Sequence, residues 1–503
     1  MNITMLLEMA AEAFSDRIAI VSGSNRLTYG ELLKLSQAAG QVFRDSDARY
    51  AVLLDVNSVA APVALFGAAF AEIPYVPLNY RLTNAELDAL LQRVVPSVLV
   101  AGGGVLDRVT LPEGVAAIGR EAFLTSLAGA TPAPAEPSDD DRRVAVQLFT
   151  SGTTGQPKAA VLRHGNLMAY ILGTVEFAAA EEDEAALVTV PPYHIAGISA
   201  LLSSIYAGRR IVVLENFDEQ AWLDACQAER VTNAFVVPTM MTRIIDKMAS
   251  EPGRWDLGAL RALAFGGGKM PLTVIERAMQ LLPHVDFTNA YGLTETSSTI
   301  CLLDPEAHRL AMSSTDPVVR RRLGSVGRPL PTVEIEIRDD EGRVLSPGDA
   351  GHVYVRGDQV AGEYQGLGSL LDADGWFPTR DRGYLDDEGY LFLDGRADDL
   401  IVRGGENISP GEIEEVLLTH PAVRDVAVVA VPDEQWGEAI GAAIVRHVGV
   451  DVHAEELQTW VRDRLRSSRV PAVIEFRSEL PYNELGKVLR RVIRDELKGR
   501  PGS

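Results

Sequence analysis

Short apolar runs rich in β-branched residues alternate with longer segments of helical periodicity between residues 50 and 290. Apolar residues at helical spacing predict helices over segments such as 218–230 and 272–282. Alternation of strands and helices is typical of largely parallel sheets covered by helices. The predicted strands are residues 50–55, 98–101, 144–150, 186–190, 210–214, 234–237, 261–265 and 285–289.

The pattern changes after residue 320. Residues 333–338 and 351–356 look like strands, and the turn-rich segment between them predicts a hairpin within a small β unit. A charged break at Gly395 and Arg396 follows, and the order after it is helix, strand, strand, helix, strand, helix. The sequence thus predicts a large N-terminal domain at residues 1–395 and a separate α+β domain at residues 396–503.

Composition narrows the class of protein. The chain has 503 residues, 47% of them hydrophobic, which is ordinary for a globular protein of several domains. Its net charge of −23 argues against a nucleic-acid partner, because phosphate binding along a duplex needs a basic face. With only two cysteines, Cys226 and Cys301, a disulfide framework is excluded and a reducing cytoplasm is expected.

No export signal or integral membrane segment is predicted. The N-terminal stretch has no basic region and contains Glu8 and Glu12, and its apolar residues recur at the spacing of a surface helix with one buried face. The apolar run at residues 59–71 is too short to cross a bilayer, which takes about 20 helical residues.

The strongest chemical signal follows the strand predicted at residues 144–150. That strand ends in a run of small hydroxyl and glycine residues that closes on Lys158. Glycines let the backbone turn tightly around an anion, hydroxyl and amide groups donate hydrogen bonds to phosphate oxygens, and a lysine adds positive charge. The spacing is not that of a P-loop. The predicted phosphate-binding residues are Thr150, Ser151, Gly152, Thr153, Thr154, Gly155 and Lys158.

This run resembles the phosphate-binding signature of the adenylate-forming superfamily, which contains acyl- and aryl-CoA synthetases, firefly luciferase and the adenylation domains of peptide synthetases. Further motifs of that family occur in the expected order over essentially the whole chain. The resemblance implies an α/β protein whose AMP-binding N-terminal domain has two parallel-type αβα sheets plus a small β-barrel-like unit. It also implies that the α+β domain at residues 396–503 is mobile.

The segment from Asn289 to Glu295 resembles the family's Y-G-x-T-E motif. By this resemblance Tyr291 stacks on adenine, Thr294 holds the α-phosphate and Glu295 is a magnesium ligand. Magnesium ions favour one or two carboxylates together with phosphate oxygens. A glycine-rich turn upstream passes beside the adenine and the acyl groove in the family. The nucleotide-binding residues implied by both motifs are Gly266, Gly267, Gly268, Asn289, Ala290, Tyr291, Gly292 and Thr294.

Asp381 ends a segment that resembles the motif W-[FY]-x-T-G-D, whose aspartate binds the ribose hydroxyls in relatives. Here Arg380 replaces the glycine. If the backbone at that position needs a positive φ, the arginine carries strain. The motif that follows implies that Arg396 contacts phosphate or ribose and that Asp398 is the hinge of the C-terminal domain.

Two motifs of the C-terminal domain imply its chemistry. Gly404, Gly405 and Glu406 resemble the segment that opens the pantetheine tunnel for CoA. Lys487 resembles the lysine that drives adenylation, because a mobile lysine can neutralise both the attacking carboxylate and the α-phosphate. One lysine cannot serve both half-reactions at once, which is the physical reason for a rotating domain.

His194 aligns with the position whose rotation gates thiol access in the family. Ile195 follows it, where amino-acid-activating domains carry an aspartate. A buried isoleucine cannot compensate an ammonium group, so amino acids are disfavoured. The apolar wall at residues 233–240 has no arginine, which argues against malonate-like diacids. The acyl pocket is expected to contain His194, Ile195, Gly197, Phe235, Val236 and Ala290.

The sequence therefore predicts an acyl-CoA ligase that uses ATP, Mg²⁺ and CoA to activate an apolar fatty or aryl acid. Its catalytic residues are expected to be Lys487, Thr294, Glu295 and His194. Two alternatives stay open: an acyl-AMP ligase that loads a carrier-protein phosphopantetheine, and a non-catalytic acyl- or nucleotide-binding protein. Carrier-loading enzymes often have an insertion before the hinge, which residues 357–375 lack, and a non-catalytic protein should have lost its lysines and glutamate. Alkyl and aryl acids stay open, as do a monomer and a homodimer.

Overall fold

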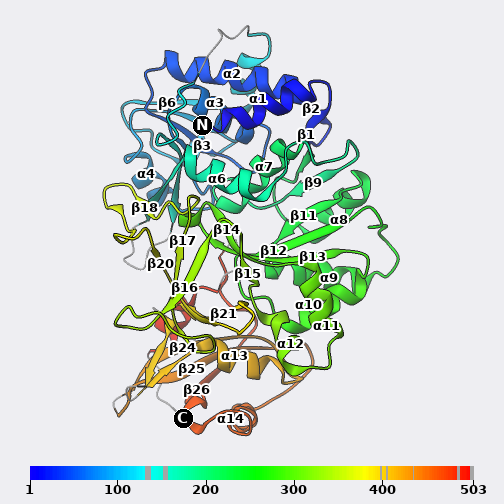
Figure 1. The fold of residues 1–503 in the computed structure, drawn as a ribbon, viewed down its shortest axis with the longest axis vertical. Coiled ribbons are helices and arrows are strands. Elements are labelled where there is room, and N and C mark those ends of the chain that lie inside the picture. The colour runs from blue at the N-terminus through cyan, green and yellow to red at the C-terminus, as the bar shows by residue number, and fades with distance from the viewer. Residues whose placement is uncertain are drawn as a thin grey trace.

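The computed structural model describes residues 1–130, 137–150, 157–396, 399–403, 406–433, 435–483 and 488–498. The N-terminal elements lie at the top of Figure 1, the sheet that contains residues 185–188, 233–236 and 262–266 occupies the middle with its helices, and the C-terminal elements lie at the bottom. A small sheet, drawn in yellow and green, connects the large body to the C-terminal elements.

The first large sheet has nine strands in the order β15-β14-β13-β12-β11-β9-β10-β1-β2. The six strands from β13 to β1 pair in parallel, and antiparallel strands flank them on both sides. The strands are β1 (Ile18–Ser22), β2 (Asn25–Thr28), β9 (Ala185–Val188), β10 (Arg210–Val213), β11 (Asn233–Val236), β12 (Ala262–Gly266), β13 (Asp286–Leu293), β14 (Ser298–Leu303) and β15 (Arg328–Pro329).

The second large sheet has eight strands in the order β19-β18-β8-β7-β4-β3-β5-β6. Pairing is parallel from β7 to β6 and antiparallel from β7 to β19. The strands are β3 (Tyr50–Leu54), β4 (Tyr75–Pro77), β5 (Ser97–Ala101), β6 (Val115–Gly119), β7 (Val144–Thr150), β8 (Lys158–Arg163), β18 (Glu363–Tyr364) and β19 (Gly368–Ser369). Both large sheets thus contain the expected run of parallel strands. Antiparallel strands flank this run on both sides in the first sheet and on one side in the second, where β6 is a parallel edge strand.

Helices cover these sheets, and local sequence signals fix where some begin. Thr28 and Thr83 each accept a hydrogen bond from the backbone of a glutamate three residues on, which starts α2 and α4 with a capping box. The helices of the large body are α1 (Thr4–Ala13), α2 (Tyr29–Asp45), α3 (Ala60–Phe70), α4 (Asn84–Leu91), α5 (Arg120–Leu127), α6 (His164–Thr174), α7 (Ile195–Ala207), α8 (Glu219–Ala228), α9 (Pro238–Ser250), α10 (Leu272–Leu281), α11 (Pro305–Ser313) and α12 (Pro317–Arg321).

The small β unit is an antiparallel sheet of four strands, which follow the order β16-β17-β20-β21. The strands are β16 (Glu334–Arg338), β17 (Gly351–Arg356), β20 (Phe377–Leu385) and β21 (Leu391–Arg396). The hairpin predicted at residues 333–356 is confirmed as β16 and β17.

The C-terminal elements begin with two short strands that the sequence did not predict, β22 (Ile401–Arg403) and β23 (Glu406–Ile408). The predicted order then follows, with α13 (Pro410–Leu418), β24 (Val423–Asp433), β25 (Gly437–Arg446), α14 (Ala454–Arg462), β26 (Val473–Arg477) and α15 (Arg490–Leu497). The five strands form one sheet, in which β26 pairs parallel to β25. Two apolar clusters pack on its opposite faces, one under α13 and α14 and one under α15.

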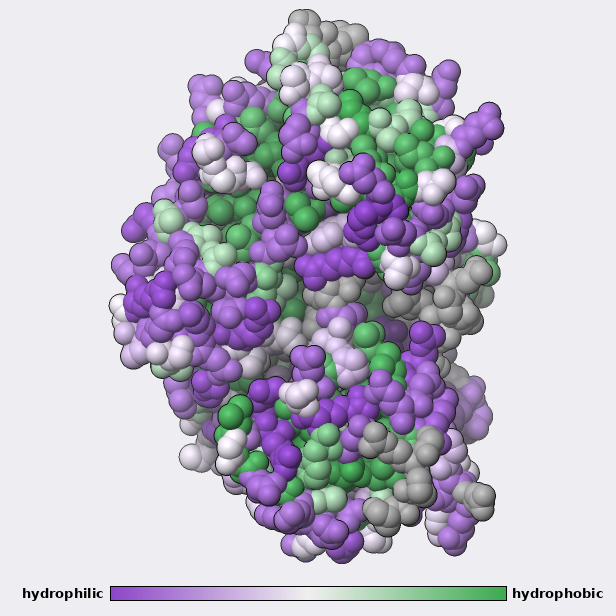
Figure 2. Space-filling view, turned by 180° about the vertical axis from the view of Figure 1, so that it is seen from behind, coloured by the Kyte–Doolittle hydropathy of each residue, from purple (hydrophilic) through white to green (hydrophobic). Residues whose placement is uncertain are grey.

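The surface agrees with the composition. The face seen in Figure 2 is mostly hydrophilic, with separate small hydrophobic areas, as the net charge of −23 leads one to expect. Of the helices in the described part of the chain, none has the length and apolar character needed to cross a bilayer. The helix predicted at the N-terminus is confirmed as α1, which buries Leu6, Leu7 and Ala10.

Candidate active site

The glycine-rich turn lies at the carboxyl ends of the parallel strands β11, β12 and β13. Gly266 ends β12 opposite Ala290 of β13. A Cβ atom at Gly266 would lie 2.2 Å from the carbonyl oxygen of Ala290, and the Phe235 ring is 3.5 Å from the same position. These three predicted site residues therefore adjoin one another. Asn289 faces the opposite side of β13 and donates a hydrogen bond from its Nδ2 to the Ser325 carbonyl at 3.0 Å.

The close fit at Gly266 leads to a matched pair of variants. Gly266→Ala forces Cβ into a backbone carbonyl, and overpacking of this kind costs about 1–3 kcal/mol. In Gly268→Ala the nearest atom to the new Cβ is Pro238 Cγ at 3.7 Å, an ordinary contact. We expect Gly266→Ala to lower the melting temperature by several degrees and Gly268→Ala to leave it unchanged. Equal melting temperatures in differential scanning fluorimetry would contradict this geometry.

Asp381 is buried between two predicted nucleotide-binding residues. Its Oδ2 accepts a hydrogen bond from the Tyr291 hydroxyl at 2.6 Å, and its Oδ1 lies 3.4 Å from Nε of Arg396, the residue opposite it on β21. Burial, and then the negative charge of Asp381, raise the pKa of Tyr291 well above its usual value. Tyr291 therefore stays protonated, and the three side chains form one hydrogen-bonded and ionic group.

Glu295 lies in a short helical turn, Thr294–Thr296, directly after β13. Its backbone carbonyl accepts hydrogen bonds from the amides of Ala361 and Gly362 at 2.9 and 3.0 Å. Its carboxylate accepts a short hydrogen bond from the hydroxyl of Tyr364, a residue of β18. Lys158, the first residue of β8, places its Nζ 5.8 Å from the centre of the Tyr364 ring. Tyr364 thus joins Lys158 and Glu295.

Arg396 connects the two groups. Burial lowers the pKa of the Arg396 guanidinium, but the negative charges of Asp381 and then Glu295 outweigh burial and raise it. Contacts through Tyr364 and Arg396 therefore link Lys158, Glu295 and Asp381, which come from distant parts of the sequence.

Tyr364 is the residue that sequence reasoning missed. It reaches Glu295 because β18 pairs with β8, and a two-bond contact between Arg163 and Glu363, with both distances 2.8 Å, holds the two strands together. Gln359 fixes the same segment by donating hydrogen bonds to the Thr296 and Thr299 carbonyls at 3.1 and 2.8 Å. Neither contact is local in sequence. The sequence around Tyr364 therefore gave no indication that this tyrosine contacts Glu295.

The strain predicted at position 380 is confirmed. Arg380 has a φ of 64°, in the left-handed region that favours glycine. The family's glycine is therefore explained by backbone conformation, and this chain keeps that conformation with an arginine.

His194 immediately precedes α7 and packs on Tyr193, with ring centres 4.6 Å apart. Its Nε2 is buried and has no hydrogen-bond partner in the described part of the chain. Burial, with a smaller contribution from the positive charge of Arg81, lowers the pKa of His194 from 6.5 to about 3. The imidazole is therefore neutral at physiological pH.

This pKa predicts how stability depends on pH. As the pH falls below 6.5, the unfolded chain binds a proton that the folded His194 does not, so folding loses at most about 1.4 kcal/mol per pH unit. We expect the melting temperature of His194→Phe to rise relative to that of the native chain as the pH is lowered from 7.5 to 5. The exposed His447 provides the control, since His447→Phe should follow the native profile. Parallel profiles for all three proteins would contradict the buried, neutral assignment.

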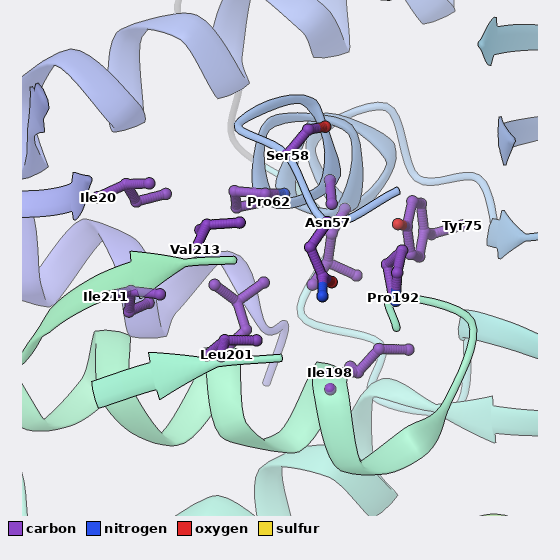
Figure 3. A pocket seen from close by; sticks show the side chains of 14 residues that line it. Ile20, Asn57, Ser58, Pro62, Tyr75, Pro192, Ile198, Leu201, Ile211 and Val213 are labelled. Carbon is purple, nitrogen blue, oxygen red and sulfur yellow. The ribbon is translucent and has the colours of Figure 1, made fainter. Parts of the chain in front are cut away.

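The predicted acyl-pocket residues divide between two faces of the sheet. Phe235 faces Gly266 and Ala290, whereas Val236 is fully buried in the core cluster behind the sheet, because alternate strand residues point to opposite sides. Gly197 lines a separate apolar cavity of about 40 Å³ between the two large sheets. Figure 3 shows side chains of β1, β10 and α7 facing Pro62 and Tyr75 across this space.

Several predicted residues lie outside the described part of the chain: Ser151, Gly152, Thr153, Thr154, Gly155, Asp398, Gly404, Gly405 and Lys487. Their described neighbours are Thr150, the last residue of β7, and Glu406, the first residue of β23, whose carboxylate forms an ion pair with Arg469. Lys269, beside the glycine-rich turn, contacts the C-terminal domain through an ion pair with Glu415 at 3.3 Å.

The oxygen ligands that the site offers fit a nucleotide that carries a magnesium ion. Among the described residues no group of three or more His, Cys, Asp or Glu side chains could hold a metal ion on its own. A carboxylate such as Glu295 would share the ion with phosphate oxygens, which is the usual arrangement for Mg²⁺.

Sheet architecture and site together define an adenylate-forming protein. Residues 7–365 match the family of AMP-binding enzymes, and residues 412–487 match the AMP-binding enzyme C-terminal domain. The chain belongs to this family, and thereby to the AMP-forming acid–thiol ligases of the adenylate-forming superfamily.

Relatives with known activities cover most of the chain. A fatty acid–[acyl-carrier-protein] ligase of Streptomyces coeruleorubidus is 35% identical over 86% of this chain and 84% of its own. A 2-succinylbenzoate–CoA ligase of Bacillus licheniformis is 32% identical over 96% and 98%. A feruloyl-CoA synthase of an Amycolatopsis species is 34% identical over 95% of both chains.

Solved structures match over the whole length. The o-succinylbenzoate CoA synthetase of Bacillus subtilis, in complex with its acyl-adenylate intermediate, has a TM-score of 0.82 at 29% identity and covers 99% of both chains. ATP-bound MatB of Rhodopseudomonas palustris has a TM-score of 0.87 at 27% identity, again over 99% of both.

Proposed function

We propose that the chain is an acid–CoA ligase. It joins an apolar fatty or aryl carboxylic acid to AMP, with release of pyrophosphate from ATP, and then transfers the acyl group to the CoA thiol. The observation that carries this proposal is the chain of contacts through Tyr364 and Arg396 that links Lys158, Glu295 and Asp381 in a member of the AMP-binding enzyme family.

In the first half-reaction a carboxylate oxygen attacks the α-phosphorus of ATP and the bond to pyrophosphate breaks. Thr150 and the glycine-rich run up to Lys158 bind the phosphates, Tyr291 stacks on adenine and Asp381 holds the ribose hydroxyls. Glu295 would hold Mg²⁺ together with phosphate oxygens, and the ion would neutralise part of the phosphate charge. Lys487 neutralises the charge that builds up between the carboxylate and the α-phosphate. Thr294 donates to that phosphate.

In the second half-reaction the domain at residues 396–503 rotates about Asp398, which withdraws Lys487 and brings Gly404, Gly405 and Glu406 toward the site. The thiol passes His194 and attacks the acyl carbonyl, and AMP leaves. The neutral imidazole of His194 supports this role, because an uncharged ring can rotate within an apolar wall without the cost of moving a buried charge.

The wall of the pocket beside the reacting carboxylate is apolar, which favours an apolar acid. Ile195 starts α7 beside His194, and Phe235 lies over Gly266, so the described wall carries no carboxylate that could pair with an α-ammonium group. The relatives named for ferulate and 2-succinylbenzoate act on acids that contain a ring. We therefore place aryl acids first among the candidates, followed by alkanoates.

One observation favours a second acceptor. The relative that is 35% identical is a fatty acid–[acyl-carrier-protein] ligase. A carrier-protein phosphopantetheine presents the same thiol arm as CoA, so the chemistry of the site is shared and only the thiol donor differs.

The test incubates the purified chain with ATP, Mg²⁺ and a panel of benzoates, cinnamates, arylacetates and alkanoates, with either CoA or a phosphopantetheinylated carrier protein as acceptor. Mass spectrometry then measures acyl-AMP and both thioesters. We expect acyl-CoA to form with at least one ring-containing acid. Thioester on the carrier protein without acyl-CoA would transfer the assignment to the second acceptor, and release of acyl-AMP without thioester would overturn both.

A further inference from the structure

Arg380 lies in a β-bulge beside the nucleotide site. His352 of β17 pairs with Arg382 and Tyr354 pairs with Pro378, so that residues 379–381 of β20 oppose only Val353. The bulge uses the left-handed conformation of Arg380, which costs a non-glycine residue roughly 1–2 kcal/mol. Strain that persists at a site is a reason to look for a role of the side chain.

The residues on either side of Arg380 are fixed, whereas its own side chain is exposed. Thr379 donates a hydrogen bond to the Val353 carbonyl at 2.8 Å and accepts one from the Asp381 amide at 3.1 Å. Thr379 and Asp381 are buried. Among the described residues no hydrogen bond or ion pair of the Arg380 guanidinium offsets the backbone strain. The bulge therefore directs Asp381 inward and leaves a cation next to it.

The Arg380 cation lies near the charged groups of the site. Its positive charge interacts with the Tyr364 hydroxyl, which donates a hydrogen bond to Glu295. Lys158 and Arg396 are further charged groups near this pair among the described residues.

On the basis of the function proposed above, on which this inference rests, we propose that Arg380 is a further nucleotide-binding residue, whose guanidinium contacts the phosphate groups of the nucleotide held by Asp381. The ribose hydroxyls and the α-phosphate of one nucleotide lie within reach of adjacent side chains, and Arg380 is adjacent to Asp381. Guanidinium groups bind phosphate through paired, charge-assisted hydrogen bonds. A contact of that strength offsets the cost of the left-handed backbone, which a glycine would not incur.

Three variants separate charge from backbone conformation. Arg380→Asn removes the charge and keeps a residue that tolerates the left-handed region, Arg380→Gly removes both charge and strain, and Arg380→Lys keeps both. Isothermal titration of the full chain with adenosine, AMP and ATP, without acid or thiol, measures each affinity. We expect the asparagine and glycine variants to bind AMP and ATP about tenfold more weakly and adenosine equally well, with the lysine variant closer to the native chain.

The melting temperature supplies the second readout, since Arg380→Gly should be more stable than the native chain although it binds AMP less tightly. Arg343→Asn, at an exposed hairpin arginine paired with Asp339 and Glu341, controls for the change in net charge and should bind as the native chain does. The proposal is overturned if AMP and adenosine lose affinity equally, if no variant changes AMP binding, or if the lysine and asparagine variants bind AMP equally. Because these titrations involve neither acid nor thiol, their failure leaves the acceptor question untouched.

Discussion

Replacement of Lys487 by alanine is expected to lower the rate of acyl-AMP formation by about a thousandfold, because loss of one preorganised group at a developing charge costs roughly 10²–10³ in rate. Thioester formation from supplied acyl-AMP should fall by less than about threefold, since the C-terminal domain withdraws this lysine before the thiol enters. Pyrophosphate release measures the first half-reaction, and consumption of synthetic acyl-AMP in the presence of CoA measures the second.

A second lysine of the same domain provides the control. Lys498 is half-exposed at the end of α15 and pairs with Asp495 at 2.9 Å, so Lys498→Ala should leave both half-reactions unchanged. Equal losses of both half-reactions in Lys487→Ala would refute its assignment to adenylation alone. The result also bears on the rotation of the domain, because a lysine needed in both steps would have no reason to leave the site.

The centres of the sheets could be predicted because a buried parallel strand is a local property of sequence. Residues 144–150 and β7 agree at both ends, and residues 210–214 and β10 differ by one residue. β13 continues beyond its predicted end at Asn289 through Tyr291 and Gly292, since a functional segment that pairs with its neighbours need not be apolar. Strand ends at a site are set by the site as much as by burial.

The site was predictable where a motif carries its own geometry and not where tertiary contacts create it. The strain at Arg380 followed from one departure from a glycine pattern, and φ confirms it. The contact of Tyr364 with both Lys158 and Glu295 was not foreseen, because it depends on β18 adding to the edge of the second sheet. Gly197 and Val236 show the same limit of sequence-based prediction. The packing of α7 and β11 decides which space each residue faces, and the apolar composition of the segment does not reveal this.

Replacement of Glu295 by glutamine is expected to lower the rate of acyl-AMP formation by about a hundredfold or more and to raise the concentration of Mg²⁺ needed for half-maximal rate. Glutamine keeps the size of the side chain and its contact with Tyr364 but removes the negative charge that a magnesium ion requires. Rates measured over a range of Mg²⁺ concentrations at saturating ATP test both effects. Glu341→Gln, at an exposed glutamate of the β16–β17 hairpin, should leave them unchanged.

Tyr364→Phe distinguishes the charge of Glu295 from its placement. The hydroxyl of Tyr364 orients one carboxylate oxygen and contributes no charge, so its loss should lower the rate about tenfold, in keeping with one charge-assisted hydrogen bond, and should change the Mg²⁺ requirement by much less than Glu295→Gln does. An effect of Tyr364→Phe as large as that of Glu295→Gln would mean that orientation of the carboxylate, and not its charge, limits the reaction. If Glu295→Gln needed the same Mg²⁺ concentration as the native chain, the ion would bind elsewhere and Glu295 would not be a magnesium ligand.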